Sequence, residues 1–550
     1  MLAKLKAKLN NREYQYLALF TLLGFFIMLI CSYTSPAFYF DYSPDNNAFF
    51  TVGKAMAHGQ VLYKDIFEQK GPYIYLLHII AYLVAQRSFV FIYFYESLTL
   101  IASMYLTYRI AKLVLTTPQA LLVGILSPAL FLYHPYYDYG DTAEFFALPL
   151  ILSLIYLIML LVVHHLRVSP WWFFAQGLFV GIEFFSKYTL LGGWIAFYLF
   201  MGVYLLRRKK WQMLQRLILW SGAGFLLATV PWIVYFAVVH GLKSFIAVYF
   251  LFNTQVYMTS SVSFFANLVQ SASLLSQFFL SSVVFFMLGL VGTLAITFRT
   301  DILPGAFAKS LYLLVFLGND IFALYGYSSG NVFQYYQLVY FPFFVLPLIY
   351  FCKFFFDRQT IRSDDDALTI LATILVSLFL VLGVNNNFTS SRLFPNNASV
   401  TDRHTKVPQA PAQTEFGDLM RAQTTGKMTL LNYGSIDMGF YTASGAVPTQ
   451  YYFQNYNIPA KSDPTILNSQ VNAIRHKQVE WVVFNTPAGK SPQAWKGLSY
   501  KPGQITDGNL NPGTAQMSKI LYRNYRYVAQ HTQSFENMNV TYWLFQRKGN

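Results

Sequence analysis

The sequence predicts a polytopic α-helical membrane protein that carries a small α/β domain after its last membrane span. Of its 550 residues, 55% are hydrophobic, 19% are aromatic and only 11% are charged, whereas soluble domains carry about 25% charged residues. The hydrophobic residues gather in long runs. Their lengths are close to the about 20 apolar residues that a membrane-spanning helix needs. After Asn385 these runs end and the composition becomes polar. The chain therefore divides into a membrane part and a part that follows it.

The net charge of +15 does not indicate nucleic-acid binding, because the basic residues lie in short gaps between apolar runs. That placement is typical of loops retained in the cytoplasm. Both cysteines, Cys31 and Cys352, lie in apolar segments. The sequence therefore encodes neither a disulfide framework nor a zinc site.

We expect about eleven spans, with the N-terminus in the cytoplasm and the C-terminus outside. Each is an apolar run, and together they cover residues 17–33, 89–106, 120–133, 145–163, 171–185, 190–206, 217–239, 275–297, 311–323, 335–350 and 368–384. The cluster Arg207-Arg208-Lys209-Lys210 is the strongest cytoplasmic signal. Residues 73–86 are too short for a crossing, so we expect a helix at the outer surface there. A longer outer loop is expected over about residues 240–273.

The region after the spans predicts an α/β domain outside the membrane. Residues 428–432, 481–485 and 541–545 are short β-like runs, and residues 414–423 and 466–476 resemble helices. Alternation of this kind is typical of small α/β domains. The expected organisation is a membrane domain over residues 1–384 with an outer loop at 35–88, a linker over 385–413 and the α/β domain over 414–550.

Charged side chains gather in the first outer stretch, residues 41–75. They are Asp41, Asp45, Lys54, Lys64, Asp65, Glu68 and Lys70. Charges beside a bilayer are a functional-site hypothesis by default. The alternative is a solvated loop that joins two spans. Because aromatic residues and a Gly-Pro pair are interleaved with the charges, we favour a folded loop on the membrane surface.

A second acidic loop, with Asp138, Asp141 and Glu144, is expected on the same side. The sequence has no P-loop, dinucleotide fingerprint or metal-binding spacing, and few charges lie in mid-span, with Glu183 the nearest. This argues against an ATP-driven pump and an ion-coupled transporter. Acids with nearby lysines suit glycosyl transfer, in which a carboxylate accepts the proton of a hydroxyl and cations stabilise a leaving phosphate. Outside the membrane the donor would be a lipid-linked sugar.

The first outer stretch resembles that of the GT-C glycosyltransferases, nearest to glycosyltransferase family 39, the protein O-mannosyltransferases and the lipid A aminoarabinose transferase. The residues that carry the resemblance are Pro44-Asp45, Gly59, Tyr63, Phe67-Glu68-Gln69-Lys70-Gly71-Pro72 and Tyr75. The family's acidic pair is Asp45-Asn46 here, Gln69 separates its Glu and Lys, and Gly71-Pro72 replaces Pro-Pro. The resemblance covers about the first two hundred residues well and the later spans in pattern only.

The resemblance implies roles for individual residues. Asp45 would be the catalytic carboxylate, Glu68 would bind a metal or the acceptor, and either Asp141 or Glu144 would supply a second acid. Lys70 and Lys187 would bind the donor phosphate. Secondary candidates are Asp41, Asp65 and Tyr336. In the structural alternatives, Asp45 is a turn residue after Pro44 and Asp141 is the N-cap of the fourth span. No cofactor is specified, although a divalent metal ion is compatible with the family.

These features together predict a hexosyl- or pentosyltransferase at the outer face of the plasma membrane. It would move a sugar from a polyprenyl-phosphate-linked donor to a cell-envelope glycan such as wall polysaccharide or teichoic acid, in a Gram-positive type of envelope. The expected partners are the donor, the acceptor and membrane lipids, with no nucleic acid. The alternatives are a transporter or flippase for a lipid-linked glycan and a non-enzymatic envelope sensor or scaffold.

Overall fold

A computed structural model describes residues 12–257, 263–298, 301–327, 332–358, 367–394, 410–456, 458, 463–494, 515–535 and 538–549. The chain divides into two compact units. The first, which we call the helical unit, comprises Met1–Cys31, Phe94–Trp232 and Ser260–Asn386. The second, which we call the sheet-bearing unit, comprises Ser32–Tyr93, Ile233–Thr259 and Asn387–Asn550. Each unit is described by itself.

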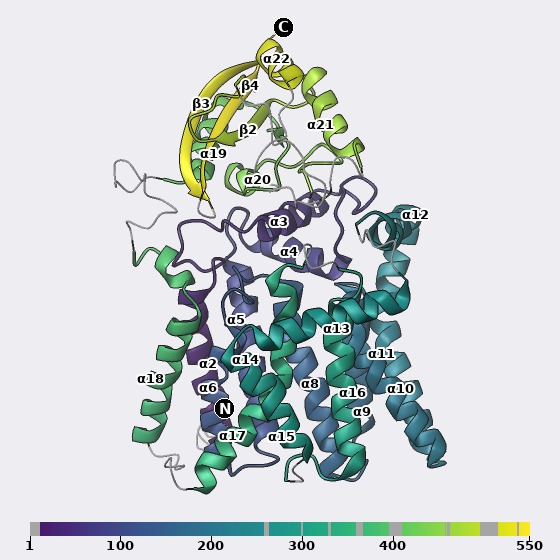
Figure 1. The fold of residues 1–550 in the computed structure, drawn as a ribbon. Coiled ribbons are helices and arrows are strands. Elements are labelled where there is room, and N and C mark those ends of the chain that lie inside the picture. The colour runs from purple at the N-terminus through teal and green to yellow at the C-terminus, as the bar shows by residue number, and fades with distance from the viewer. Residues whose placement is uncertain are drawn as a thin grey trace, which may run out of the picture. The chain divides into compact units, whose positions relative to one another are not determined.

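Long apolar helices make up most of the helical unit (Figure 1). In chain order they are α2 (Arg12–Cys31), α5 (Val90–Ala111), α6 (Thr117–Leu126), α7 (Pro128–Phe131), α8 (Ala143–Val163), α9 (Pro170–Phe184), η1 (Tyr188–Leu191), α10 (Gly192–Arg207), α11 (Trp211–Val238), α13 (Phe264–Leu280), α14 (Val283–Phe285), η3 (Phe286–Gly292), α15 (Thr293–Phe298), α16 (Gly305–Ala323), η4 (Gln334–Phe344), α17 (Val345–Asp357) and α18 (Ala367–Val384). Among the described residues, 8 helices are long and apolar enough to cross a membrane, and a bent pair raises the number to 9. Helices α6–α7 and α9 occupy two further predicted spans but are shorter. The predicted polytopic helical fold is therefore confirmed.

The span predicted over residues 275–297 is not one straight helix. The chain breaks after Leu280, and α13 and the following Val283–Phe298 differ in direction by 110°. Two serines stabilise the break, because Ser281 donates its hydroxyl to the Phe278 carbonyl at 2.7 Å and Ser282 accepts the Val284 N–H at 3.2 Å. The outer loop predicted over 240–273 is also largely helical, with α12 (Leu242–Phe245), η2 (Ile246–Tyr257) and the start of α13.

The first outer stretch of the sheet-bearing unit forms two helices, α3 (Pro44–Ala57) and α4 (Pro72–Val84). Proline begins each helix at its first turn, where its missing N–H removes no helical bond. The buried side chains of Phe50, Ala81, Phe89 and Ile92 form a small core. The short helix predicted at 73–86 is confirmed as α4, and its position at a membrane surface stays a prediction. The loop predicted over 41–75 is in fact helical from Pro44 to Ala57.

The C-terminal part of this unit is a four-stranded mixed sheet with helices. Its elements are α19 (Ala412–Gln423), β1 (Leu430–Asn432), α20 (Phe440–Ser444), α21 (Thr465–Arg475), β2 (Trp481–Pro487), α22 (Ala515–Asn524), β3 (Tyr525–Phe535) and β4 (Met538–Arg547). The strand order is β1-β2-β4-β3, with β1 parallel to β2 and the other pairs antiparallel. Helices α21 and α22 lie side by side (Figure 1).

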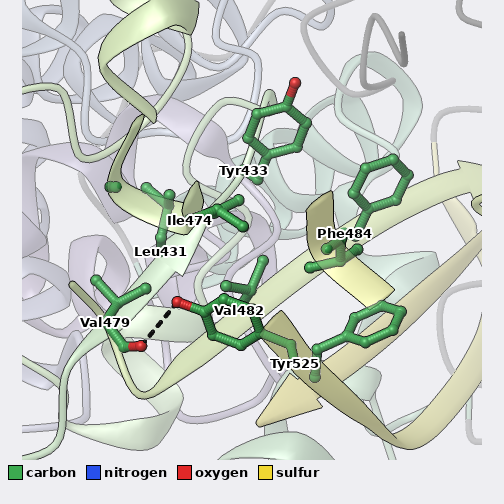
Figure 2. Close-up of a cluster of buried hydrophobic side chains, with 10 residues drawn as sticks. Leu431, Tyr433, Ile474, Val479, Val482, Phe484 and Tyr525 are labelled. Carbon is green, nitrogen blue, oxygen red and sulfur yellow. Dashed lines mark hydrogen bonds between the residues drawn. The ribbon is translucent and has the colours of Figure 1, made fainter. Parts of the chain in front are cut away.

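Buried apolar side chains from the strands and from α21 hold the sheet together. Figure 2 shows Leu431, Val482 and Phe484 packed with Ile474, and Tyr525 donating its hydroxyl to the Val479 carbonyl at 2.9 Å. The predicted α/β fold is confirmed, including its three predicted strands and two predicted helices. Strand β3 was not predicted. The linker predicted over residues 385–413 contains η5 (Asn387–Ser390), and residues 395–409 of it lie outside the described residues.

Candidate functional site

The predicted site residues fall into two clusters, one in each unit. The first, which we call the loop cluster, contains Asp41, Asp45, Glu68 and Lys70 of the sheet-bearing unit. The second, which we call the helix-end cluster, belongs to the helical unit. Its members are Glu96, Asp141, Glu144, Glu183, Lys187 and Tyr336.

Asp45 lies in the first turn of α3, where its negative charge is favoured by the free N–H groups of the helix start. Ser43 is the N-cap and accepts the Asn46 N–H at 3.3 Å. Asp41 shapes this entry, since one carboxylate oxygen accepts the Ser43 N–H at 2.9 Å and the other accepts the Asn46 amide at 2.8 Å. Asp45 is therefore a helix-start residue with a half-buried carboxylate, whereas Asp41 uses both its oxygens within the turn.

Glu68 is buried, with only 7% of its surface exposed. Its Oε1 accepts the Gln69 N–H at 2.6 Å, and its Oε2 accepts the Gln454 side-chain amide at 3.1 Å. Burial is the main reason that the pKa of Glu68 is raised, and the charge of Asp45 adds to it. The Gln69 N–H, Lys70 and Gln454 act in the opposite direction, and the resulting pKa is about 7. A carboxyl group with a pKa near neutrality can exchange a proton at physiological pH.

The backbone around Glu68 is fixed by side chains from distant parts of the chain. Tyr63 donates its hydroxyl to the Lys70 carbonyl at 2.6 Å. Asn253 of η2 donates its amide to the Gln69 carbonyl at 2.9 Å. Lys70 is half-buried, so the segment presents both a carboxylate and an ammonium group from a rigid backbone. Asp65 is exposed and accepts the Val61 N–H at 2.8 Å, which stabilises a surface turn.

In the helix-end cluster, α8 begins at Ala143 with Thr142 as its N-cap, whose hydroxyl accepts the Phe145 N–H at 3.1 Å. The alternative that Asp141 caps this helix is therefore wrong. Asp141 is fully buried and adopts a left-handed backbone conformation with φ of 52°. Its N–H donates to the carboxylate of Glu96 at 2.7 Å. A non-glycine residue held in this conformation is typical of functional sites.

Lys187 is buried and paired with an acid that is buried as well. Its ammonium forms an ion pair with Glu144, and Nζ lies 3.6 Å from the centre of the Tyr336 ring. Glu183, at the end of α9, interacts electrostatically with both Glu144 and Lys187. An ion pair and a cation–π contact hold the lysine in place, so the cluster offers a positioned cation paired with the Glu144 carboxylate.

Sequence reasoning missed Glu96 and Gln454 and did not place Glu183 in the site. A carboxylate inside an apolar span was a usable signal for Glu96 and Glu183. Gln454 carries no such signal. No three His, Cys, Asp or Glu side chains in the described part of the chain gather as a metal ion would require. The structure therefore assigns no ligands to the predicted divalent ion, which stays a prediction.

Comparison with known proteins identifies the fold. No protein-family model and no curated protein matches the sequence. The solved structure of ArnT from Cupriavidus metallidurans bound to undecaprenyl phosphate is similar with a TM-score of 0.55 and 12% identity, covering 96% of this chain and 97% of ArnT.

Two further solved structures resemble the chain less. AglB from Archaeoglobus fulgidus has a TM-score of 0.42 at 12% identity, covering 86% of this chain and 69% of AglB. The arabinofuranosyltransferase AftD from Mycobacteria has a TM-score of 0.47 at 12% identity, covering 98% of this chain and 42% of AftD. We base the assignment on ArnT alone. The chain therefore has the fold of ArnT, which agrees with the fold that the resemblance of the first outer stretch predicted.

Proposed function

We propose that this protein is a polyprenyl-phosphate-dependent glycosyltransferase that modifies a cell-envelope glycan at the outer face of the plasma membrane. The observation that carries the proposal is the similarity in fold to ArnT over 96% of this chain and 97% of ArnT, whose structure contains undecaprenyl phosphate. The two clusters add the groups that such a transfer needs, namely carboxylates and buried or half-buried lysines.

The proposed reaction is a displacement at the anomeric carbon of the sugar. A hydroxyl oxygen of the acceptor attacks C1, and the bond from C1 to the phosphate oxygen breaks, with both electrons leaving on the polyprenyl phosphate. Asp45 accepts the hydroxyl proton as the general base. Its place in the first turn of α3 holds this carboxylate on a defined backbone.

We assign Lys187 and Lys70 to the phosphate of the donor. Lys187 is already held by Glu144 and Tyr336, so little side-chain entropy is lost when an anion binds. Positioned cations stabilise charge as it develops on a leaving phosphate. In this scheme Glu144 orients Lys187, and the Tyr336 ring packs against the Lys187 ammonium group. Asp141, whose backbone is held by Glu96, is the proposed second acid.

We assign Glu68 to the acceptor. Because its pKa is about 7, part of the protein carries an ionised Glu68 at neutral pH, and the carboxylate form accepts a hydrogen bond from a sugar hydroxyl. A hydrogen bond to a charged acceptor is shorter and stronger than one between neutral groups. The acceptors that fit are envelope glycans such as wall polysaccharide or teichoic acid.

The test is the glycan composition of the cell envelope, measured by mass spectrometry. A deletion strain is complemented with wild type, Asp45→Asn, Lys70→Ala or Lys64→Ala, and the amount of each variant in the membrane fraction is matched. Lys64 is the control because it is exposed on the same stretch and its ammonium donates to a backbone carbonyl, that of Val239, at 3.1 Å. We expect one sugar substituent to vanish with the deletion and to return with wild type and Lys64→Ala.

Asp45→Asn and Lys70→Ala should leave that substituent absent or reduced at least about 100-fold, since a positioned base contributes about 10²–10⁴ in rate. Full restoration by Asp45→Asn would remove Asp45 from the reaction. An unchanged envelope in the deletion strain, under conditions in which the gene is expressed, would contradict the transferase function itself.

A further inference from the structure

We infer that the C-terminal domain, residues 410–549, takes part in catalysis by positioning Glu68, and that Gln454 is the residue through which it does so. The inference rests on the proposed function, which gives Glu68 its role at the acceptor. Nothing in the local sequence around Glu68 points to this dependence, because Gln454 lies 386 residues further along the chain.

A buried chain of hydrogen bonds runs from α3 through the C-terminal domain to Glu68. Thr51 of α3 donates its hydroxyl to Asp437 Oδ2 at 2.6 Å. The Asp437 N–H donates to Gln454 Oε1 at 2.7 Å, and Gln454 Nε2 donates to Glu68 Oε2 at 3.1 Å. Because a backbone N–H can only donate, it fixes the oxygen of the Gln454 amide and turns the NH₂ group toward Glu68.

The same short segment of the domain also fixes the backbone next to Glu68. The Phe67 N–H donates to the Tyr451 carbonyl at 2.9 Å, and Tyr456 donates its hydroxyl to the Phe67 carbonyl at 2.7 Å. The Phe67 ring packs against the rings of Tyr451, Tyr452 and Tyr456, with centroid distances of 5.8, 5.2 and 4.8 Å. Residues 451–456 thus fix the position of Phe67, and with it the backbone that carries Glu68.

Asp437, the other anchor of Gln454, is itself immobilised. Its Oδ1 accepts the Gly439 N–H at 2.8 Å. Lys54 of α3 is fully buried, interacts electrostatically with Asp437 and donates to the Tyr441 carbonyl at 2.6 Å. A network in which every link is bonded at both ends is rigid, so the position of Gln454 follows from the fold of the domain.

Removing the Gln454 amide should change the protonation of Glu68. The carboxylate faces the charged groups Asp45 and Lys70 and the hydroxyl groups of Tyr63, Tyr75 and Tyr456. Of these, Lys70 lies on the same segment and favours the carboxylate, whereas Asp45 opposes it. Without the donor from Gln454, the buried carboxylate loses a hydrogen bond and its pKa rises.

The test compares two buried glutamines of the same domain. Gln454→Met removes the bond to Glu68 and keeps the approximate volume of the side chain. Gln470→Met is the matched control, because Gln470 is also buried, accepts the Gly434 N–H at 2.8 Å and donates to the Tyr452 carbonyl at 3.2 Å. A purely structural effect of losing a buried amide should therefore appear in both variants.

The measurement is kcat/KM for sugar transfer as a function of pH, on the purified full-length protein. We expect the acidic limb of the profile to move upward by about one pH unit in Gln454→Met, and to stay in place in Gln470→Met. Gln454→Glu keeps the acceptor for the Asp437 N–H and places a carboxylate beside Glu68. The acidic limb of its pH profile should therefore move to a still higher pH. Equal profiles for wild type and both Gln454 variants would overturn the inference.

A second readout separates this inference from the proposed function. The infrared carboxylate band of Glu68, identified by its loss in Glu68→Gln, is titrated in wild type, Gln454→Met and Gln470→Met without substrate. A Glu68 pKa that rises only in Gln454→Met supports the positioning contact, even if no sample transfers sugar. If no sample transfers sugar, the proposed function fails and the contact stands. A titration unchanged in Gln454→Met overturns the contact whatever the activity.

Discussion

Burial gives two side chains of the sheet-bearing unit pKa values near neutrality. Glu68 is a carboxylic acid whose pKa burial raises to about 7. Lys54 is an amine whose pKa burial lowers to about 7, and the neighbouring Asp437 partly offsets this effect. Burial in the same unit thus raises the pKa of an acid and lowers the pKa of a base, because desolvation always disfavours the charged form. The protonation of this region is consequently sensitive to pH in the physiological range.

The stability of the protein should therefore depend on pH through Glu68. The folded-state pKa of about 7 lies above the ordinary glutamate pKa of 4.5, so the unfolded chain releases this proton first as pH rises. Stability falls between about pH 4.5 and 7, by a total of about 3 kcal/mol, and the loss is complete above that window. Glu68→Gln carries no charge to bury. Its melting temperature in detergent, relative to wild type, should rise by a few degrees between pH 5 and pH 8.

A difference in melting temperature between Glu68→Gln and wild type that stays flat from pH 5 to pH 8 would contradict this account. A difference that falls with rising pH would mean that the ionised carboxylate is stabilised in the fold, contrary to the effect of its burial. Glu68→Gln and wild type are measured in the same detergent and at the same ionic strength, because salt changes the effect of Lys70 and Asp45 on the pKa of Glu68.

The residues of the candidate site differ in how far the sequence could predict them. Asp45, Glu68 and Lys70 stand out because charge beside a bilayer is rare and because their spacing resembles a family pattern. Their roles stay predictions. Gln454 and Asp437 could not be found this way, because they are ordinary polar residues of a polar domain. They act on α3 and Glu68 through contacts across 386 residues of chain, and such contacts leave no periodic trace.

At the scale of elements, helix α3 shows why periodicity fails where a helix buries polar side chains. Its buried positions include Asn46, Asn47 and Thr51, which a hydrophobic pattern counts as exposed. Each takes part in hydrogen bonds, for example from the Asn47 amide nitrogen to the Asp41 carbonyl at 2.8 Å. A helix that buries polar residues has no apolar stripe, so the sequence predicts a loop. Strand β3 was missed for a similar reason, because Arg526, Gln530 and Gln533 leave it with no apolar run longer than three residues.

Helices α9 and α11 approach one another closely at glycine. An added Cβ at Gly224 of α11 would lie 2.1 Å from the Phe174 carbonyl oxygen of α9, whereas one at Gly222 would meet nothing within 4 Å. Small residues at such crossings let helix backbones pack closely in membranes. Gly224→Ala should therefore destabilise the protein by about 1–3 kcal/mol, because the backbone of α9 cannot yield as a side chain would.

Gly222→Ala is the matched control on the same helix. It adds the same methyl group into open space and should be neutral or slightly stabilising, since alanine is favoured over glycine in helices by about 1 kcal/mol. The measurement is the melting temperature and the yield of folded protein in detergent. Equal stability of the two variants would show that α9 and α11 do not approach at Gly224.

At the scale of the whole molecule, the fold was predictable because a bilayer limits the choice. A chain in lipid must satisfy its backbone hydrogen bonds within each segment, so apolar runs read as helices. The direction of a helix is not limited in this way. Two serines hydrogen-bond to the backbone at the bend of 110° between α13 and the following helices, and an apolar run looks the same whether it is straight or bent. The number of crossings therefore depends on whether the bent pair spans the membrane.

The basic clusters allow this number to be argued. Arg207–Lys210 and the pair Lys353 and Arg358 are both expected in the cytoplasm. Between them lie α11, the bent pair, α16 and the helix formed by η4 and α17. If the bent pair crosses the membrane, an even number of crossings separates the two clusters and both lie inside. If it is a re-entrant loop, one cluster lies outside. The positive-inside rule therefore favours a crossing, and with α18 it predicts a C-terminal domain outside the membrane.

Cysteine labelling tests this topology. Cys31 and Cys352 are replaced by alanine, and a single cysteine is introduced at Lys210, after α10, or at Ala422 of α19, both of which are exposed. A membrane-impermeant maleimide should label Ala422→Cys in intact cells and Lys210→Cys only after permeabilisation. If the bent pair is re-entrant, an even number of crossings separates the two positions, so both would be labelled under the same condition. Labelling of Lys210→Cys alone in intact cells would invert the topology and put the C-terminal domain, with Gln454, in the cytoplasm. A lipid-linked donor would then no longer be required, because nucleotide sugars are available there.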